Sequence, residues 1–218
     1  MNKVIKKEQK EIHKTVFKPG TMLNPVPVVM VSCGDEKNKN IITVAWTGII
    51  NSEPPITYVS IRKERFSHDI IKKTGEFVIN LTTEKLAFAT DYCGVRSGSK
   101  VNKFKEQRLT PIESKLVKCP SIEESPVNIE CKVLEIREFP THDMFIAEIV
   151  SVSVDESLMD EKGRVHLEEA GLIAYSHGEY FALEKMPLGK FGYSVMKPKT
   201  KKRLAAERKK HNSGKNSR

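Results

Sequence analysis

The sequence contains few cysteines, and their spacing excludes several kinds of site. Only four of the 218 residues are cysteine, and one is tryptophan. Cys33, Cys93, Cys119 and Cys131 are widely separated, so no pair has the close spacing of a zinc knuckle or a redox CxxC motif. We therefore expect buried, reduced thiols with no catalytic or metal-binding role.

Long hydrophobic runs are also missing. No apolar stretch approaches the ~20 residues that a membrane-spanning helix needs. Residues 1–14 contain lysines but no apolar core of the signal-peptide type behind them. The sequence therefore predicts a cytoplasmic protein without membrane insertion. We expect residues 1–14 to form an N-terminal arm, for which strand, helix and irregular chain all stay open.

The common catalytic and nucleotide-binding motifs are absent. The chain has neither the GxGxxG motif of dinucleotide-binding folds nor the GxxxxGK[ST] motif of P-loops. Its six histidines form no HxxxH or HExxH pair, so we predict no metal site. Ser67, His68 and Asp69 are consecutive, and consecutive side chains do not align as one hydrogen-bonded catalytic relay. We predict no catalytic side chain.

The positive charge of the chain is confined to its end. The formal net charge is +9. Residues 197–218 hold ten Lys and Arg and one acid, Glu207, while the other 196 residues hold 27 basic and 27 acidic groups. The body therefore has no net positive field to attract nucleic acid. We expect the tail, 197–218, to be disordered or a solvated helix, because it has too little apolar surface to fold alone.

What the sequence does contain is a series of short apolar or alternating segments separated by turn residues. These segments predict strands. They are residues 28–33, 41–46, 56–61, 77–81, 127–136, 145–154 and 180–183. Short helices are expected from Ser67, as N-cap, to Gly75, and over 83–92 with a stop at Gly94. A mainly β barrel with short helical inserts over residues 15–196 follows from this pattern.

The stretch between Asn40 and Asn80 contains a candidate anion site. Arg62 and Arg65 precede the expected helix start at Ser67, and guanidinium groups, backbone N–H groups and the helix dipole all favour negative charge there. The alternative is a set of solvated charges beside an ordinary N-cap. Trp46 is either a core residue or the wall of a site for a flat aromatic ligand. Lys103, after a Gly/Ser loop, is either a ligand contact or a structural residue.

Several motifs, in their order and spacing, resemble the flavin reductase-like, FMN-binding split β-barrel family. The resemblance spans about residues 20–196, and the last motif is similar to the flavoredoxin branch. The motifs are Asn24-Pro25-Val26-Pro27-Val28, Asn40-x-x-Thr43-x-Ala45-Trp46-Thr47-Gly48, Ser60-Ile61-Arg62, Arg65-Phe66-Ser67-His68-Asp69-Ile70, Gly75-Glu76-Phe77-Val78-Ile79-Asn80, Lys103-Phe104 and Leu188-Gly189-Lys190-Phe191-Gly192-Tyr193-Ser194.

The resemblance implies a homodimer of Greek-key-type split barrels with FMN near the subunit interface. It places Thr43, Ala45, Trp46 and Thr47 beside the isoalloxazine and ribityl chain. It assigns Ser60, Arg62 and Ser67 to the phosphate, with Arg65 assisting. It adds Asn80 and Lys103, with the loop 97–103, to the pocket, and it brings His177 and Tyr180 toward the flavin, from the partner chain in one arrangement.

Two functions of different classes follow. The first is an FMN-binding oxidoreductase that transfers electrons or hydride through the flavin. Its donor would be NAD(P)H, as a transient partner, or a redox protein, as in an electron carrier. A phosphate and a planar ring need arginines, backbone donors and apolar walls, so no catalytic acid or base is required. The second is a non-enzymatic protein whose basic tail binds nucleic acid or an acidic partner.

Overall fold

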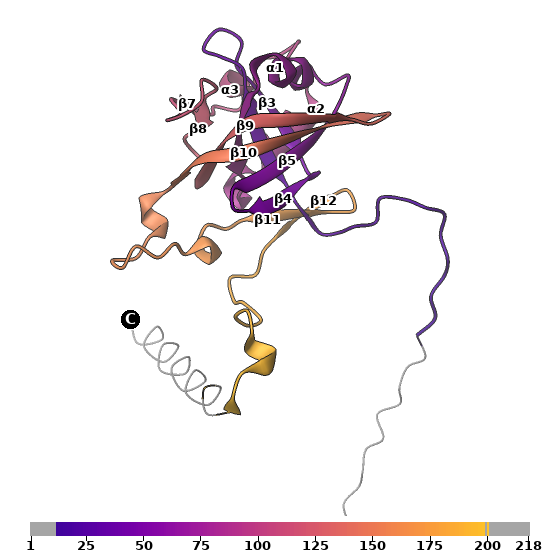
Figure 1. The fold of residues 1–218 in the computed structure, drawn as a ribbon, viewed down its shortest axis with the longest axis vertical. Helices are drawn as coiled ribbons and strands as arrows, with labels where there is room; N and C mark the ends of the chain where they lie inside the picture. Colours follow the sequence, from indigo (N-terminus) through magenta and orange to yellow (C-terminus); the bar gives the residue numbers. More distant parts are fainter. Residues whose placement is uncertain (1–11, 199, 201–218) are drawn as a thin grey trace, which may run out of the picture.

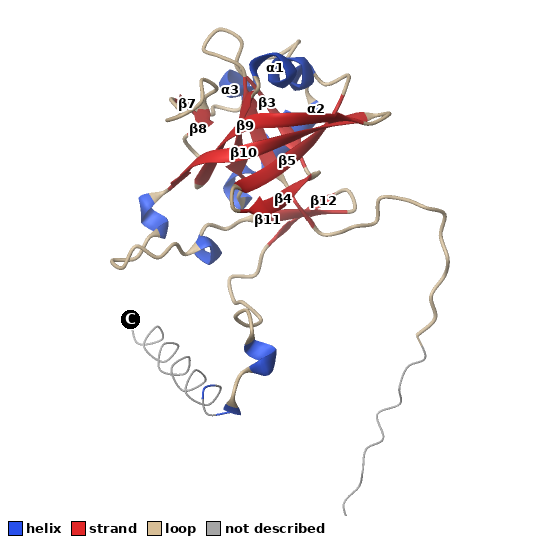
Figure 2. Cartoon of the chain, viewed as in Figure 1, coloured by secondary structure: helices blue, strands red, loops and turns tan. Residues whose placement is uncertain are grey.

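A seven-stranded antiparallel sheet forms the body of the molecule. The computed structural model describes residues 12–198 and 200 (Figure 1). The strand order of the main sheet is β3-β2-β6-β9-β10-β5-β4, and β1-β11-β12 and β7-β8 form two smaller sheets. Strands dominate the described chain and its helices are short (Figure 2), so the predicted mainly β class is confirmed. Most of the predicted tail and most of the N-terminal arm lie outside the described residues.

The elements of the fold follow one another at short intervals. The strands are β1 (Val26–Pro27), β2 (Val29–Cys33), β3 (Asn40–Val44), β4 (Thr47–Ser52), β5 (Pro55–Arg62), β6 (Glu76–Leu81), β7 (Pro111–Ile112), β8 (Ser121–Ile122), β9 (Val127–Glu138), β10 (His142–Val154), β11 (Ile173–Ser176) and β12 (Glu179–Ala182). The helices are α1 (Phe66–Thr74), α2 (Ala87–Val95) and α3 (Lys103–Glu106), with 3-10 turns η1 (Glu84–Leu86), η2 (Glu156–Leu158), η3 (Leu167–Glu169) and η4 (Tyr193–Val195).

The sheet closes into a barrel through one short connection. Its two edge strands, β3 and β4, are consecutive in the chain and are separated only by Ala45 and Trp46. The Ser60 N–H of β5 donates a hydrogen bond to the Trp46 carbonyl at 2.9 Å. Because the chain leaves one edge of the sheet and enters the other within two residues, Ala45 and Trp46 form the seam of the barrel.

Side chains at alternate strand positions fill the barrel. This follows from the two-residue period of a β-strand, which sends successive side chains to opposite faces. Ile71 of α1 packs against the same interior. The cluster contains Val29, Val31, Cys33, Ile42, Val44, Val59, Ile61, Ile71, Phe77, Ile79, Cys131, Phe145 and Ala147. All four cysteines are buried free thiols, as predicted, and burial raises the pKa of Cys33 to about 12.

The outer faces of β2 and β3 are also covered, by helices α2 and α3. Met30 and Ile41 point away from the barrel and pack with Ala89, Cys93 and Phe104. With apolar contacts on both faces, a strand has no solvent-facing positions. This explains why β2 is a continuous apolar run in the sequence and shows no alternation of polar residues.

Strand β4 lies between the predicted strands 41–46 and 56–61, where no strand was predicted, and the first of these ends at Val44. Gly48 lies inside β4. A Cβ at Gly48 would come within 3.2 Å of Cε1 of Tyr58, so the strand uses glycine for a close approach to the ring. Strand β10 begins at His142, three residues before the predicted strand 145–154.

The helix boundaries also differ from the prediction. Ser67 is not the N-cap of α1: Arg65 occupies that position, without a side-chain cap bond, and Ser67 is buried inside the helix. Gly75 ends the helix in the left-handed region at φ 68°, as expected. Helix α2 continues through Gly94 to Val95, because Gly94 lies against Thr43 of β3. Within the described ranges, no helix combines the length and apolar character needed to cross a membrane.

Candidate functional site

A pocket of about 430 Å³ lies at the seam of the barrel. Its walls come from β3, β5, the first residue of β10, the C-terminal half of α2 and the β11–β12 hairpin. These elements are distant in the sequence and meet only because the sheet closes at Ala45 and Trp46. The pocket is therefore a product of barrel closure.

The pocket brings together most of the residues that the sequence singled out. Arg62 and Arg65 contribute charge, and Trp46 contributes an aromatic wall that is 43% exposed. Tyr180 comes from the same chain in this structure. The predicted residues that line the pocket are Thr43, Ala45, Trp46, Ser60, Arg62, Arg65 and Tyr180.

Other predicted residues do not line this pocket. Thr47 donates its hydroxyl hydrogen bond to the Tyr58 carbonyl at 2.6 Å, and Ser67 accepts one from Asn40 Nδ2 at 2.7 Å. His177, at φ 52°, occupies the turn between β11 and β12 beside Gly178, which does line the pocket. Their contacts with a ligand stay predictions.

Asn80 and Lys103 are buried and hydrogen-bonded within the fold. Asn80 is 0% exposed, donates to the Met30 carbonyl at 2.9 Å and accepts from the Ile122 N–H at 3.0 Å. Lys103 Nζ donates to the carbonyls of Ile41 and Cys93 at 2.6 and 2.8 Å. Burial lowers the pKa of Lys103 to about 8. In this structure both side chains stabilise the packing behind the pocket.

Two guanidinium groups lie where α1 begins. Arg62 ends β5, with about half of its side chain exposed, and its contact with Glu64 at 3.5 Å joins two exposed groups and is weak. Arg65 is the N-cap residue and donates to the Gly94 carbonyl, which fixes its position against α2. Arginine side chains can form paired hydrogen bonds with a phosphate or carboxylate. This end of the pocket is suited to an anionic group.

Trp46 and His142 form an aromatic wall. Their ring centroids are 4.6 Å apart with an interplanar angle of 49°. Burial lowers the pKa of His142, and the nearby charge of Arg62 lowers it further, so the imidazole is neutral near pH 7. Its Nδ1 is 2.8 Å from the Thr141 hydroxyl, which fixes the ring orientation. A neutral pair of rings in contact with each other is suited to a planar aromatic ligand.

Tyr180 and Asp91 lie at another wall of the pocket. The Tyr180 hydroxyl donates to Asp91 Oδ1 at 3.2 Å, and the Tyr180 ring contacts the Tyr175 ring edge-on with centroids 5.5 Å apart. Burial raises the pKa of Tyr180 to about 12, with a further contribution from the Asp91 charge. The phenol therefore stays protonated and keeps its hydrogen bond at neutral pH.

The sequence analysis missed several residues of the pocket. Strand pairing places His142 opposite Arg62, 80 positions away in the chain. Only the register of β10 against β5 identifies His142 as a pocket residue, and the sequence alone does not give this register. The other missed polar and aromatic residues are Asp91 and Tyr175, which reach the pocket from α2 and β11.

The donor set suits an organic anion with a flat aromatic part. In the part of the chain that the structure describes, no group of three or more His, Cys, Asp and Glu side chains could hold a metal ion. The arginines, the two tilted rings and the apolar side chains of Ile42, Val44 and Ile61 have the character of a cofactor site: mostly apolar walls with a few convergent polar groups.

Comparison with known proteins identifies a family and similar folds. A family model described as "Flavin reductase like domain" matches residues 21–184. A flavoredoxin of Desulfovibrio vulgaris (Miyazaki F) has a similar structure, with a TM-score of 0.77 and 30% identity, covering 84% of this chain and 100% of that one. A flavoredoxin from Methanosarcina acetivorans has a TM-score of 0.72 and 26% identity, covering 87% and 100%.

A relative of this chain is also known from sequence. A protein of Archaeoglobus fulgidus, named only as uncharacterized, is 36% identical over 140 residues, which is 64% of this chain and 78% of that protein. The residues matched by the family model, 21–184, include the barrel and its seam. The predicted split-barrel fold and the resemblance to the flavoredoxin branch are therefore confirmed.

Proposed function

Since the chain belongs to the flavin reductase-like domain family, we propose that it is an oxidoreductase that binds FMN in the pocket at the barrel seam. One observation carries the proposal: Arg62, Arg65 and Trp46 line one pocket, and FMN combines a phosphate with a planar ring. Flavoredoxin of similar fold and sequence supports the assignment to a flavin.

The residues of the pocket divide between the two parts of the ligand. Arg62 and Arg65, with Ser60, bind the phosphate at the start of α1. Trp46 and His142 pack against the isoalloxazine and exclude water from it. Thr43 of β3 and Ala45 of the seam present backbone groups to the ring, and the further predicted contacts of Thr47, Ser67, Asn80 and Lys103 belong to the same proposal.

In this proposal the protein binds and orients FMN, and the redox step takes place on FMN itself. Bound FMN supplies the redox chemistry by accepting and returning electrons. Neither the neutral His142 nor the protonated Tyr180 is needed as an acid or base. Their role is to hold the ring and to close the pocket.

Two electron donors fit the proposal. NAD(P)H would act as a transient hydride donor in a flavin reductase, whereas a redox protein would reduce the flavin in a flavoredoxin-like carrier. We also propose a homodimer in the cytoplasm, where a reducing environment would keep the four buried cysteines as free thiols.

Absorbance measurements on the purified full-length chain test the proposal. After addition of FMN and removal of the excess, we expect a flavin spectrum at one flavin per chain. A double variant Arg62→Ala/Arg65→Ala should retain much less flavin at the same far-UV circular dichroism. If the folded wild type binds no FMN, the proposed cofactor is wrong.

Anaerobic addition of NADH and NADPH then separates the two donors. Rapid bleaching of the bound flavin by either nucleotide identifies a reductase. A flavin that neither nucleotide bleaches, but that dithionite does, requires a protein donor and identifies a carrier.

A further inference from the structure

Three polar side chains lie behind the arginine end of the pocket. Asp143 and His68 are buried, whereas the Lys63 side chain is 43% exposed. Oδ2 of Asp143 is 2.8 Å from Nε2 of His68, and Oδ1 of Asp143 is 3.3 Å from Nζ of Lys63. None of the three residues lines the pocket. Any effect that they have on a ligand is therefore transmitted by other residues.

The two arginines of the pocket lie in one turn, and Asp143 contacts both sides of that turn. The Arg65 N–H donates to the Arg62 carbonyl at 3.0 Å, and the His68 N–H donates to the Arg65 carbonyl at 2.8 Å. Lys63 lies between the two arginines in the sequence, and His68 lies in the first turn of α1 after them. Since Asp143 contacts both Lys63 and His68, its carboxylate spans the turn that presents the two guanidinium groups.

Strand β10 is the firm support of this turn. Asp143 belongs to β10, whose register against β5 places His142 opposite Arg62. The His68 ring also packs edge-on against Phe145 of β10, with ring centroids 5.4 Å apart. The start of α1 is thus fixed to the sheet by one hydrogen-bonding contact and one aromatic contact.

Like charges converge at the turn, so its shape needs support. Arg62 and Arg65 line the same pocket, and two guanidinium groups directed at one site repel each other. The exposed contact of Arg62 with Glu64 is weak and does little to hold the side chain. Paired hydrogen bonds from arginine to a phosphate depend on geometry as well as on charge. A shift of this turn would therefore weaken phosphate binding even with both arginines present.

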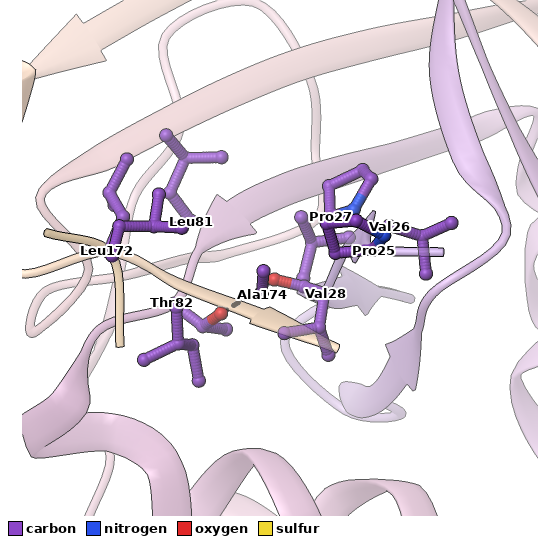
Figure 3. A pocket seen from close by; sticks show the side chains of 11 residues that line it. Pro25, Val26, Pro27, Val28, Leu81, Thr82, Leu172 and Ala174 are labelled. Carbon is purple, nitrogen blue, oxygen red and sulfur yellow. Dashed lines mark hydrogen bonds between the residues drawn. The ribbon is translucent and has the colours of Figure 1, made fainter. Parts of the chain in front are cut away.

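A second cavity of the described chain has no charged end. An apolar groove of about 310 Å³ lies between β1 and the start of β11, with Pro25 and Pro27 on one side and Leu172 on the other (Figure 3). Its one polar side chain belongs to Thr82, whose hydroxyl donates to the Val28 carbonyl at 2.6 Å. Of these two cavities, only the pocket at the seam offers cationic groups to an anion. Discrimination between a phosphorylated ligand and its neutral analogue therefore reports on that pocket.

We propose that Asp143 is a positioning residue for the phosphate of FMN. Through His68 and Lys63, it holds the two arginines of the turn where they can bind a phosphate monoester together. This inference rests on the proposed flavin site and deepens it. The negative charge of Asp143 by itself repels a phosphate, so removal of that charge alone would tighten FMN binding. A positioning role predicts the opposite sign.

Fluorescence titration of the purified full-length variants with FMN and with riboflavin tests the proposal. In Asp143→Asn we expect the FMN affinity to fall roughly fivefold or more, as for a misaligned hydrogen bond to a charged group, while the riboflavin affinity changes little. Glu130→Gln is the matched control. Glu130 is also a buried carboxylate and accepts hydrogen bonds from the N–H groups of Lys115 and Leu116 at 2.8 and 2.6 Å, but it does not line the pocket. It should leave both affinities unchanged.

Two variants of His68 decide the question if Asp143→Asn does not fold. His68→Leu removes the donor that faces Asp143, whereas the side-chain amide in His68→Gln still offers a donor. We expect the leucine variant to lose FMN affinity and to keep its riboflavin affinity. The glutamine variant should keep most of both. Equal FMN affinities in the two variants would overturn the proposal.

The outcomes distinguish this inference from the proposed function. A folded wild type that binds neither flavin overturns the flavin site and the inference with it. If the wild type binds FMN but Asp143→Asn keeps or gains FMN affinity, the positioning role is wrong and the flavin site stands. The same holds if Asp143→Asn loses affinity for FMN and riboflavin equally, since that result indicates a general structural role.

Discussion

The Tyr180 hydroxyl is hydrogen-bonded to Asp91 Oδ1 at 3.2 Å, although the two residues are 89 positions apart. Tyr180 lies on β12 and Asp91 on α2, and both line the pocket at the seam. A side-chain contact thus joins the β11–β12 hairpin to the barrel across the ligand site. The hairpin is one wall of the pocket, so this contact bears on how readily a ligand leaves.

Replacement of Tyr180 by phenylalanine removes that contact and keeps the ring. A net hydrogen bond contributes about 1 kcal/mol, so FMN should dissociate roughly fivefold faster. Stopped-flow recovery of flavin fluorescence measures the rate. Tyr193→Phe is the matched control, because Tyr193 lies in η4 and outside the pocket. Equal rates in Tyr180→Phe and wild type would contradict the role of the hairpin.

Replacement of Arg62 by alanine should separate FMN from riboflavin. Arg62 makes only an exposed contact with Glu64, so its loss leaves the fold intact. A hydrogen bond to a charged group contributes about 1.5–3 kcal/mol, which predicts a roughly 10- to 100-fold weaker FMN affinity. Riboflavin lacks the phosphate and should lose little. Fluorescence titration with both ligands gives the comparison, with Arg137→Ala on β9 as control. An equal loss for both would place the phosphate elsewhere.

Asp143→Asn should destabilise the fold through the buried contact of Asp143 with His68. Asp143 is 1% exposed, with Oδ2 at 2.8 Å from His68 Nε2 and Oδ1 at 3.3 Å from Lys63 Nζ. The change removes a carboxylate that accepts a buried hydrogen bond, and a hydrogen bond to a charged group contributes about 1.5–3 kcal/mol. Urea denaturation at pH 7 measures the loss, with Glu36→Gln as control because Glu36 is exposed.

The same pair should give a pH dependence. Burial on its own raises the pKa of Asp143, but hydrogen bonds from His68 and Lys63 outweigh this, and the pKa lies below its ordinary 3.8. Near and below pH 3.8 the unfolded chain therefore binds more protons at this group. Its stabilisation is present above that pH and is lost as the pH falls through the folded-state pKa. The stability gap between wild type and Asp143→Asn should narrow from pH 5 to pH 2.5.

Lys103→Met should differ from wild type in how stability depends on pH, and in the alkaline range. The pKa of Lys103 is lowered by burial from 10.5 to about 8. Between these values the unfolded chain binds more protons, so this group makes the fold more stable as pH rises from about 8 to 10.5. Denaturation at pH 7.5, 9 and 10 should show wild type gaining relative to Lys103→Met. As the pH rises over this range, the buried thiols lower the free energy of unfolding of both proteins. The comparison between wild type and Lys103→Met therefore reports mainly on Lys103. A constant difference would contradict the lowered pKa of Lys103 in the folded chain.

The sequence predicted those parts of the site whose residues lie close together along the chain. Thr43, Ala45 and Trp46 lie at the end of one strand, and Ser60 and Arg62 at the end of another, so their local motifs sufficed. Asn80 was different. It alternates with Ile79 and Leu81, so it points away from the barrel interior. The segment that covers it there, around Ile122 and Asn128, is far along the chain.

Strand order was the other missing information. Which strand pairs with β5 cannot be read from apolar alternation, because every half-buried strand has the same pattern. The pairing of β10 with β5 brings His142 beside Arg62, and the covering hairpin brings Tyr175 and Tyr180. The helix start was misplaced for a related reason. Ser67 has the chemistry of a cap, but packing against Asn40 places it inside the helix.

Because the ligand pocket lies at the seam of Ala45 and Trp46, a bound ligand should prevent the barrel from opening there. The Ser60 amide that is bonded to Trp46 can exchange its proton with solvent only when this corner separates from β5. A ligand held by β3, Trp46 and Arg62 binds the closed corner and not the open one. Each tenfold excess of FMN over its dissociation constant should therefore slow deuterium uptake at Ser60 about tenfold. Isotope exchange at one amide would report the occupancy of the pocket without any use of the flavin's colour.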